Sequence, residues 1–553
     1  MFSLLRSKSF GNVAKTVSRI IPQLRTYSSP MVNQAMQLQQ TEICADPPSR
    51  ALILGVYADE EDKYDTGILT PSAWRYNVQK TGGRMLDVLR RSGPIPKRGE
   101  TRILFGIEPE KVPYYSAVAV VGLGKECLGY NSYEVIDEQK EAIRRSVAKA
   151  CMDLAYLDTY SIEVENCGHA ESAAEGAALG IWAYQELKDP KSRIGIPTID
   201  LYTHKDEICD IEGWRIGLQK AAAQNLTRQL QEMPSNMLTP TAFAQTVVEV
   251  LCKSGVNVEV KVEGWAVSQS MHSFLSVGKA SCEPPIFLEL SYYGTSGEER
   301  PIVLVGQGIT YDSGGLCLKD LQELVHMRGD MTGAAVVVAA CRAIAGLRLP
   351  VNIRGLIPLC ENVIGCNSFR PGDCTKTMNG KFIEIQGTNH EDVLVLADAL
   401  LYAQNFCPKF IVDIGCTSGY MRNALDEAAC GVFTNSEILW QQIKHASMHT
   451  GDRVWRFPLW NYYSKLVTSS DATDVQNYGI ARGGRPCKAA AFLREFVPCG
   501  QWMHIDVTNV MVTNGKHFEY IRQGMAGRPT RTLIEFIAQT ICKDTAPKAN
   551  PKK

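Results

Sequence analysis

Residues 306–334 read GQGITYDSGGLCLKDLQELVHMRGDMTGA, and this stretch decides how the rest of the chain is interpreted. It follows the apolar run PIVLV, which is typical of a buried strand, and it leads into an Ala- and Val-rich segment that predicts a helix. Between these elements, Asp312 and Asp330 flank Lys319. Hard divalent cations prefer oxygen ligands, and a buried carboxylate requires a counter-charge, so the pattern favours a metal site. Asp is also common in turns and at helix N-caps, which leaves a structural role open.

A second stretch, residues 385–400, reads IQGTNHEDVLVLADAL. It places Glu391 in a polar turn directly before an apolar helix, at the type of position where a side chain reaches the end of a sheet. A third carboxylate in such a place favours a metal site over a purely structural role of these acids in turns.

Together these stretches resemble the signatures of the leucyl aminopeptidase family of two-metal exopeptidases. Six shorter segments carry the same resemblance: 224–228 (QNLTR), 236–240 (NMLTP), 358–362 (PLCEN), 431–435 (GVFTN), 451–455 (GDRVW) and 524–531 (GMAGRPTR). The likeness covers nearly everything after about residue 210, and the preceding part more loosely. It implies a homohexamer of two stacked trimers whose active sites face an interior cavity.

The resemblance also implies roles for individual residues. Asp312, Asp330 and Glu391 match metal-ligand positions and keep their carboxylates. Lys319 matches the catalytic lysine that polarises the peptide carbonyl and stabilises the developing oxyanion.

Three positions depart from the family pattern. Gln307 stands where the family has a metal-binding lysine, and an amide oxygen can coordinate but is a weaker donor than an amine. Asn389 replaces a metal-binding aspartate, so the ligand sphere falls from four carboxylates to three. Val393 replaces the arginine that holds a bicarbonate serving as the base, and its isopropyl group cannot hold an anion.

Neighbouring positions change as well. His390 and Asp392 replace small residues and crowd or recharge the same turn, and His390 is a conceivable replacement ligand or base. The loop at 415–419 (GCTSG) stands where the family has Ala-Thr-Leu-Thr-Gly, so the wall that contacts the substrate is altered.

These departures predict a large loss of activity. Changes around a metal site cost about 10–100-fold, and losing general-base assistance costs about 10²–10⁴-fold. Together they predict a loss of roughly five orders of magnitude, although such effects are not strictly additive. We therefore expect a pseudoenzyme with little or no peptidase activity that binds one divalent ion, manganese or zinc, without a full second site.

The chain further resembles the sperm-type leucyl aminopeptidases, and this resemblance implies a structural, packing role for the hexamer in sperm. Two alternatives stay open. One is an active two-metal (manganese or zinc) aminopeptidase that removes N-terminal residues from peptides. The other is a peptide- or metal-binding module without turnover.

Composition narrows the class of protein. The 553 residues carry a net charge of −1, which gives no support to binding of nucleic acid or of a membrane surface. No uncharged apolar run is long enough to predict a transmembrane helix. The eighteen cysteines contain no Cys-x-x-Cys pair, so we expect mostly reduced thiols rather than a redox or zinc motif.

The N-terminus has the composition of a mitochondrial transit peptide. Residues 1–41 carry Arg6, Lys8, Lys15, Arg19 and Arg25 and no acidic residue. We predict a transit peptide at 1–27 and a location in the mitochondrial matrix; a solvated tail is the alternative.

The remaining chain alternates strand-like runs with amphipathic helices, which predicts an α/β protein of two domains, each a mostly parallel or mixed sheet flanked by helices. We place the N-terminal domain at 46–206, a linking helix at 207–235, the larger aminopeptidase-like domain at 236–543 and a disordered tail at 544–553. A helix is expected over 168–187, and the pair His445 and His449 is expected on a solvated helix face.

Overall fold

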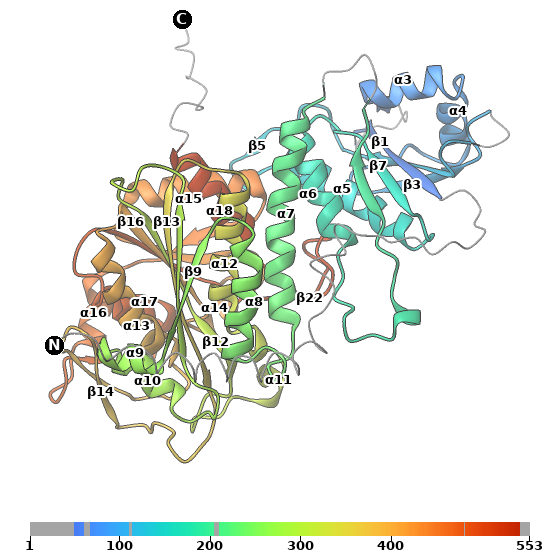
Figure 1. Ribbon diagram of the computed structural model, residues 1–553. Helices are drawn as coiled ribbons and strands as arrows, with labels where there is room; N and C mark the ends of the chain where they lie inside the picture. Colours follow the sequence, from blue (N-terminus) through green and yellow to red (C-terminus); the bar gives the residue numbers. More distant parts are fainter. Residues whose placement is uncertain (1–48, 60–66, 110–112, 204–208, 481, 542–553) are drawn as a thin grey trace, which may run out of the picture. The chain divides into compact units, whose positions relative to one another are not determined.

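The computed structural model describes residues 49–59, 67–109, 113–203, 209–480 and 482–541 (Figure 1). The transit peptide predicted at 1–27 and the tail predicted at 544–553 lie outside the described residues. Two α/β domains with mixed sheets flanked by helices confirm the predicted fold class. The exact domain limits given above stay predictions.

The N-terminal sheet is built around β1 (Arg50–Tyr57), which runs parallel to its neighbours β4 (Ala117–Gly122) and β7 (Ser161–Val164). In spatial order its strands are β3 (Thr101–Phe105), β4, β1, β7 and β8 (Thr198–Leu201), with β2 (Ile68–Leu69) paired to β1. Successive side chains of a strand point to opposite faces, so β1 contributes to two separate apolar cores. Ala51 and Ile53 belong to one of these cores, and Leu52 and Leu54 belong to the other.

Helices cover both faces of this sheet (Figure 1). They are α3 (Pro71–Gln79) and α4 (Arg84–Arg91) on one face, and α5 (Glu138–Ala155) and α6 (Ala170–Ile181) on the other. The helix expected over 168–187 is too long, because Trp182 already has extended backbone angles. Its indole ring lies 4.1 Å from the guanidinium of Arg228, so the chain leaves the helix where this stacking contact forms.

The predicted linking helix is α7 (Ile211–Glu232), which packs on α6 and on α12 (Thr332–Gly346). A buried ion cluster joins the same region to the last helix, α18 (Thr530–Ile541). Arg531 Nη1 of α18 lies 2.7 Å from Glu175 Oε2 of α6, and Arg144 Nε of α5 lies 2.5 Å from the same oxygen. Removing one partner of a buried ion pair is strongly destabilising, so this cluster ties helices of the two predicted domains together.

The C-terminal sheet is larger and mixed. In spatial order its strands are β18 (Val454–Arg456), β17 (Cys430–Thr434), β20 (Gln501–Asp506), β16 (Phe410–Gly415), β11 (Ile302–Gly306), β13 (Asn352–Asn362), β10 (Ile286–Tyr293) and β9 (Asn257–Val262), with β12 (Gly308–Asp312) paired to β13. The centre, from β20 to β13, is parallel. The antiparallel pairs β17–β20, β10–β13 and β9–β10 lie towards the two edges.

Each face of this sheet is covered by helices. One core holds Ile302 and Leu304, the other holds Val303 and Val305, so β11 alternates as a central strand should. The helices of the first core are α7, α8 (Pro240–Cys252), α12, α15 (Glu437–Thr450) and α18; those of the second are α10 (His272–Gly278), α13 (Asp392–Ala403) and α17 (Arg485–Arg494).

The parallel strands deliver several polar groups to one edge of the sheet. Gln307 follows β11, Asp312 ends β12, Asn362 ends β13 and Cys416 follows β16. The start of α12 is drawn in against this edge at Gly333, where a Cβ would lie 2.0 Å from the carbonyl oxygen of Ile414. Only glycine permits that approach, and the approach brings the residues just before α12 to the strand ends.

Two further findings concern the described part of the chain. None of its helices combines the length and the apolar character needed to span a membrane. Its cysteines are free thiols, as expected from the absence of a redox motif.

Candidate metal centre

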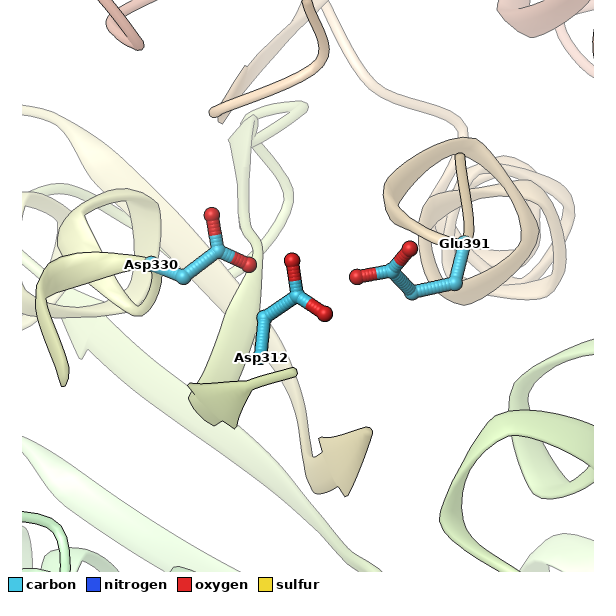
Figure 2. A group of neighbouring side chains, drawn as sticks. All are labelled: Asp312, Asp330 and Glu391. Carbon is cyan, nitrogen blue, oxygen red and sulfur yellow. The ribbon is translucent and has the colours of Figure 1, made fainter. Parts of the chain in front are cut away.

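Three buried carboxylates meet at this edge of the sheet. Asp312 comes from the end of β12, Asp330 from the turn before α12, and Glu391 from the residue before α13. One oxygen of each lies within 4.8 Å of the others, and Figure 2 shows the three side chains converging. The sequence predicted these residues as ligands, and the structure brings them together.

Asp312 is held in place on one side and paired on the other. Its Oδ1 accepts hydrogen bonds from Gly314 N at 2.7 Å and from Asn362 Nδ2 at 2.8 Å. Its Oδ2 forms an ion pair with Lys319, whose Nζ also lies 3.3 Å from Met327 Sδ. Lys319, the residue matched to the catalytic lysine, thus lies inside the site. Burial alone would lower the pKa of Lys319, but the carboxylates of Glu391 and Asp330 outweigh it and raise that pKa.

Glu391 is the clearest indication that these carboxylates could hold a metal ion. It is fully buried, and neither carboxylate oxygen has a hydrogen-bond partner among the residues that the structure describes. Burial raises the pKa of Glu391, and burial raises that of Asp330 to about 7 despite the neighbouring Lys319 ammonium. An unpaired carboxylate in a protein interior is costly. Oxygen ligands in this number fit one hard divalent ion, so the residues present fit a metal here.

Gln307 does not offer its oxygen to this site. Its Oε1 accepts a 2.6 Å hydrogen bond from the backbone N–H of Cys416. Because an N–H group requires an acceptor, that contact fixes the orientation of the amide. Its NH₂ group therefore points the other way and donates to Asp330 Oδ2 at 2.7 Å and to Asp392 Oδ1 at 3.0 Å. The expectation that the Gln307 oxygen could coordinate a metal is wrong for this arrangement.

Asp392 is a fourth buried carboxylate at the site. The expected fall from four ligand carboxylates to three does not count Asp392, and the sequence suggested only that this residue recharges the turn. The structure places it against Gln307 and gives it a pKa raised well above the ordinary value, first by burial and then by Glu391 and Asp330. The sequence did carry a signal for this carboxylate: the acid lost at Asn389 is followed, three residues later, by a new acid at Asp392. Asp392 lies outside the group formed by Asp312, Asp330 and Glu391.

The other two substituted positions behave differently from each other. Asn389 is half-buried and lines the cavity above the carboxylates. Val393 is buried in the apolar core that α13 shares with the sheet, beside Leu394 and Leu396. Its isopropyl group carries neither a charge nor a hydrogen-bond donor for an anion.

His390 is engaged by a cation. Arg485 Nη1 lies 2.8 Å from His390 Nε2, so that ring nitrogen accepts a hydrogen bond and Nδ1 carries the proton. Burial, followed by the charge of Arg485, lowers the pKa of His390 to about 3. A general base needs a pKa near the working pH, so His390 is a poor replacement base.

The cavity over the carboxylates has a volume of about 390 Å³. Its wall includes the altered loop at 415–419, where Thr417 Oγ1 lies 2.9 Å from His504 Nε2 and 3.0 Å from Asp506 Oδ2. His504 Nδ1 lies 2.6 Å from Asp413 Oδ1, so a buried hydrogen-bond chain supports this wall. The sequence predicted a changed wall but gave no sign of this hydrogen-bond chain, because His504 and its partner Asp413 are 91 residues apart.

His445 and His449 do not form a second metal group. His445 is exposed, with Nδ1 2.8 Å from Gln539 Oε1. His449 is half-buried, and Lys140 Nζ lies 2.6 Å from its Nδ1. The expectation of a solvated face is therefore wrong for His449, because α5 packs over it.

Sequence comparison assigns both halves of the chain to the same protein family. The catalytic-domain model of the cytosol aminopeptidase family matches residues 225–534, and the model of that family's N-terminal domain matches residues 53–191. The cytosol aminopeptidase of Xenopus tropicalis is 44% identical over 494 residues, which cover 89% of this chain and 92% of that protein. The human cytosol aminopeptidase is 42% identical over 492 residues, covering 88% and 92%.

Comparison with solved structures agrees with this result of the sequence comparison. Bottromycin maturation enzyme BotP superposes with a TM-score of 0.74 at 27% identity, covering 89% of this chain and 99% of that one. A second structure, of the same enzyme in complex with Mn, gives the same TM-score and identity and covers 100% of that chain.

Proposed function

Because this chain belongs to the cytosol aminopeptidase family, we propose that it is a catalytically impaired member that keeps the fold and has little or no peptidase activity. The observation that carries the proposal is the amide of Gln307. Its NH₂ group donates to Asp330 and Asp392, so Gln307 presents hydrogens and not a lone pair to any second cation beside these carboxylates. The backbone N–H of Cys416 prevents the amide from turning its oxygen inwards, because that turn would leave two donors facing each other.

The missing base supports the same proposal. Val393 lies in an apolar core and supplies no charge that could hold an anion. His390 has no free lone pair to accept a proton from water, because its Nε2 already accepts a hydrogen bond from Arg485. The residues of the site thus retain the carboxylates and Lys319 but lack the anion-holding arginine, and His390 does not replace the base.

We propose that one divalent ion, manganese or zinc, binds Asp312, Asp330 and Glu391. The three converging carboxylates and the orphaned oxygens of Glu391 support it, and the Mn complex of BotP supports manganese. When bound, such an ion would act as a Lewis acid and lower the pKa of a bound water. The chain's own part is to hold the ion on three carboxylates and to place Lys319 beside them.

Assembly and location follow from the family and the first residues. We propose a homohexamer in the mitochondrial matrix with a structural role in sperm. The family membership supports the hexamer, and the basic, acid-free composition of residues 1–41 supports import. The sperm role rests on sequence resemblance alone.

Turnover and metal content in revertants test the impairment. The chain without residues 1–27, loaded with manganese or zinc, would be assayed on a leucyl amide beside a Gln307→Lys/Asn389→Asp double variant and a triple variant that adds Val393→Arg. We expect no measurable turnover and about one ion per wild-type chain, by elemental analysis, and a second ion in the double variant. The triple variant restores the anion-binding arginine and should show activity.

Because Val393 is buried among apolar side chains, the added arginine is expected to destabilise the triple variant. A melting curve on each variant separates loss of folding from lack of activity. Clear turnover by the wild-type chain would favour the alternative, an active two-metal aminopeptidase, which the retention of Lys319 and the three carboxylates keeps as the second candidate.

A further inference from the structure

Three side chains at the cavity wall are joined in the order that acyl-transfer enzymes use. Thr417 Oγ1 lies 2.9 Å from His504 Nε2, and His504 Nδ1 lies 2.6 Å from Asp413 Oδ1. The second oxygen of Asp413 accepts a 2.5 Å hydrogen bond from the indole N–H of Trp502. A hydroxyl, an imidazole and a carboxylate linked in this way have the geometry of a nucleophile, its base and the group that orients the base.

The sheet fixes the two inner members of this hydrogen-bond chain. Asp413 of β16 and His504 of β20 are direct partners in the parallel register of these strands, and both are fully buried. The His504 ring also stacks on the rings of Phe433 and Trp502, at centroid distances of 5.9 and 6.4 Å. The imidazole is therefore held in one orientation, with Nε2 directed at the loop that carries Thr417.

The charges around His504 suit it to accept a proton. The Asp413 carboxylate holds a proton on Nδ1, which leaves the lone pair of the neutral ring on Nε2, facing the Thr417 hydroxyl. Burial alone would lower the pKa of His504, but the carboxylates of Asp413 and Asp506 outweigh it and raise that pKa. Asp506 Oδ2, 3.0 Å from Thr417 Oγ1, is a second acceptor for the same hydroxyl. The hydroxyl proton of Thr417 thus has a buried base within reach.

Thr417 is the member of this chain that meets the cavity. It lines the space above the carboxylates but is only 3% exposed, which favours a small acyl group over a bulky one. Lys319 lines the same cavity and places a cation there for a developing oxyanion. In the loop at 415–419, Thr417 stands where the family pattern has leucine, and leucine could not bond to His504. The hydroxyl is thus a feature of this chain.

We propose that Thr417 is a nucleophile that accepts the acyl group of a short-chain carboxylic ester. Its Oγ1 bonds to the carbonyl carbon while its proton passes to His504 Nε2, and the ester C–O bond then breaks as the leaving alkoxide takes that proton. Water, deprotonated in the same way, then cleaves the acyl-threonine into a carboxylic acid and the free hydroxyl. An ester is the substrate class because an alkoxide leaves more readily than the amine of a peptide. No step uses the metal site, so this activity is separate from the proposed function.

Acetylation of the full chain by p-nitrophenyl acetate tests the proposal, in mildly alkaline buffer with a chelator. Release of nitrophenol gives the rate, and mass spectrometry of proteolytic fragments locates the acetyl group. We expect it on Thr417, and a rate that falls at least about 100-fold in Thr417→Leu. That variant restores the residue of the family pattern, so it should fold, and a melting curve checks this.

Thr508→Val is the matched control. Thr508 also lines the cavity and donates to Asp506, with Oγ1 2.6 Å from Asp506 Oδ1, but it has no hydrogen bond to His504 in the described part of the chain. This variant should keep the wild-type rate. Thr417→Ser, which keeps a hydroxyl, should remain acetylated. In the wild type the rate should rise with pH as His504 loses its proton, and His504→Gln should lose this dependence and most of the rate.

Other outcomes overturn the proposal. No acetyl group on Thr417, or an equal rate in the wild type and a folded Thr417→Leu, would each do so. Acetylation that requires added manganese would assign ester cleavage to the metal centre instead. Turnover of a leucyl amide by the wild type would contradict the proposed impairment and would leave acetylation of Thr417 in the chelator untouched, so the two proposals fail separately.

Discussion

At the scale of single residues, the side chain of Gln307 is the most informative. A lysine at this position would add charge and a metal ligand, whereas the amide adds two neutral donors that satisfy Asp330 and Asp392. Hydrogen bonds to a charged acceptor contribute more than neutral ones. This position can therefore be stable without a second cation, which is the physical basis for expecting one ion per chain.

Glu391 gives a prediction for stability. Replacing it with Gln removes a buried charge that has no partner in the metal-free chain. We expect Glu391→Gln to be more stable than the wild type in a chelator, by about 1–3 kcal/mol, and to lose the stabilisation that manganese gives the wild type. Thermal melts with and without manganese measure both effects.

Glu361→Gln is the matched control for that prediction. Glu361 lies at the end of the same sheet, accepts a 2.6 Å hydrogen bond from Ser281 Oγ, and is not part of the carboxylate group. Its variant should respond to manganese like the wild type. A manganese-induced rise in melting temperature that survives in Glu391→Gln would remove Glu391 from the ligand set.

The residue scale also shows the limit of sequence reasoning. Asp312, Asp330, Lys319 and Glu391 could be predicted because short motifs place them at strand and helix ends. The orientation of the Gln307 amide could not, because it depends on a backbone N–H about 110 residues away, on Cys416. Long-range hydrogen bonds of this kind leave no local pattern.

At the scale of elements, strands and helices were predicted well where their residues are apolar and regularly spaced. β11 matches the strand expected from the run PIVLV, because a Val, Ile and Leu run bounded by turns is a strong signal. The packing of α15 against α5 was missed. The two helices are about 300 residues apart in sequence, and only the fold brings His449 to Lys140.

That packing predicts a pH dependence. Burial, with the charge of Lys140, lowers the pKa of His449 from 6.5 to about 4. Between these values the unfolded chain binds a proton at His449 and the folded chain does not, so stability is lost as pH falls from 6.5 towards 4. The variant His449→Gln keeps an acceptor for Lys140. As pH falls over this range, its free energy of unfolding should decrease by on the order of 1 kcal/mol less than that of the wild type.

Urea unfolding at a series of pH values measures the difference. His445→Gln, one helical turn away and exposed, should follow the wild-type profile. Identical profiles for wild type and His449→Gln would contradict the proposed role of this contact.

At the scale of the whole molecule, the assembly can be tested without any assay of activity. We expect the purified chain to form a closed hexamer, since homo-oligomers adopt closed symmetry. Native mass spectrometry should give six copies of the chain at micromolar concentration. A mass of one, two or three copies, unchanged on raising the concentration, would refute the hexamer.

The proposed import has an equally direct test. Residues 1–27 fused to a fluorescent protein should direct it to mitochondria in cultured cells. A fusion in which Arg6, Lys8, Lys15, Arg19 and Arg25 are all changed to Gln should stay in the cytosol, because the positive charge of the segment drives recognition. Cytosolic fluorescence from the unchanged fusion would exclude the matrix location.

The ion pair between Glu175 and Arg531 sets an order of events during synthesis. The two residues are 356 positions apart, so a ribosome adding roughly 5–20 residues per second makes the second one tens of seconds after the first. Until translation is nearly finished, Glu175 has Arg144 but lacks its last partner, and the helices around it cannot reach their final packing. If the chain is imported as proposed, a contact that forms only after the trailing end has emerged would leave the leading half without that restraint during passage through a translocation pore.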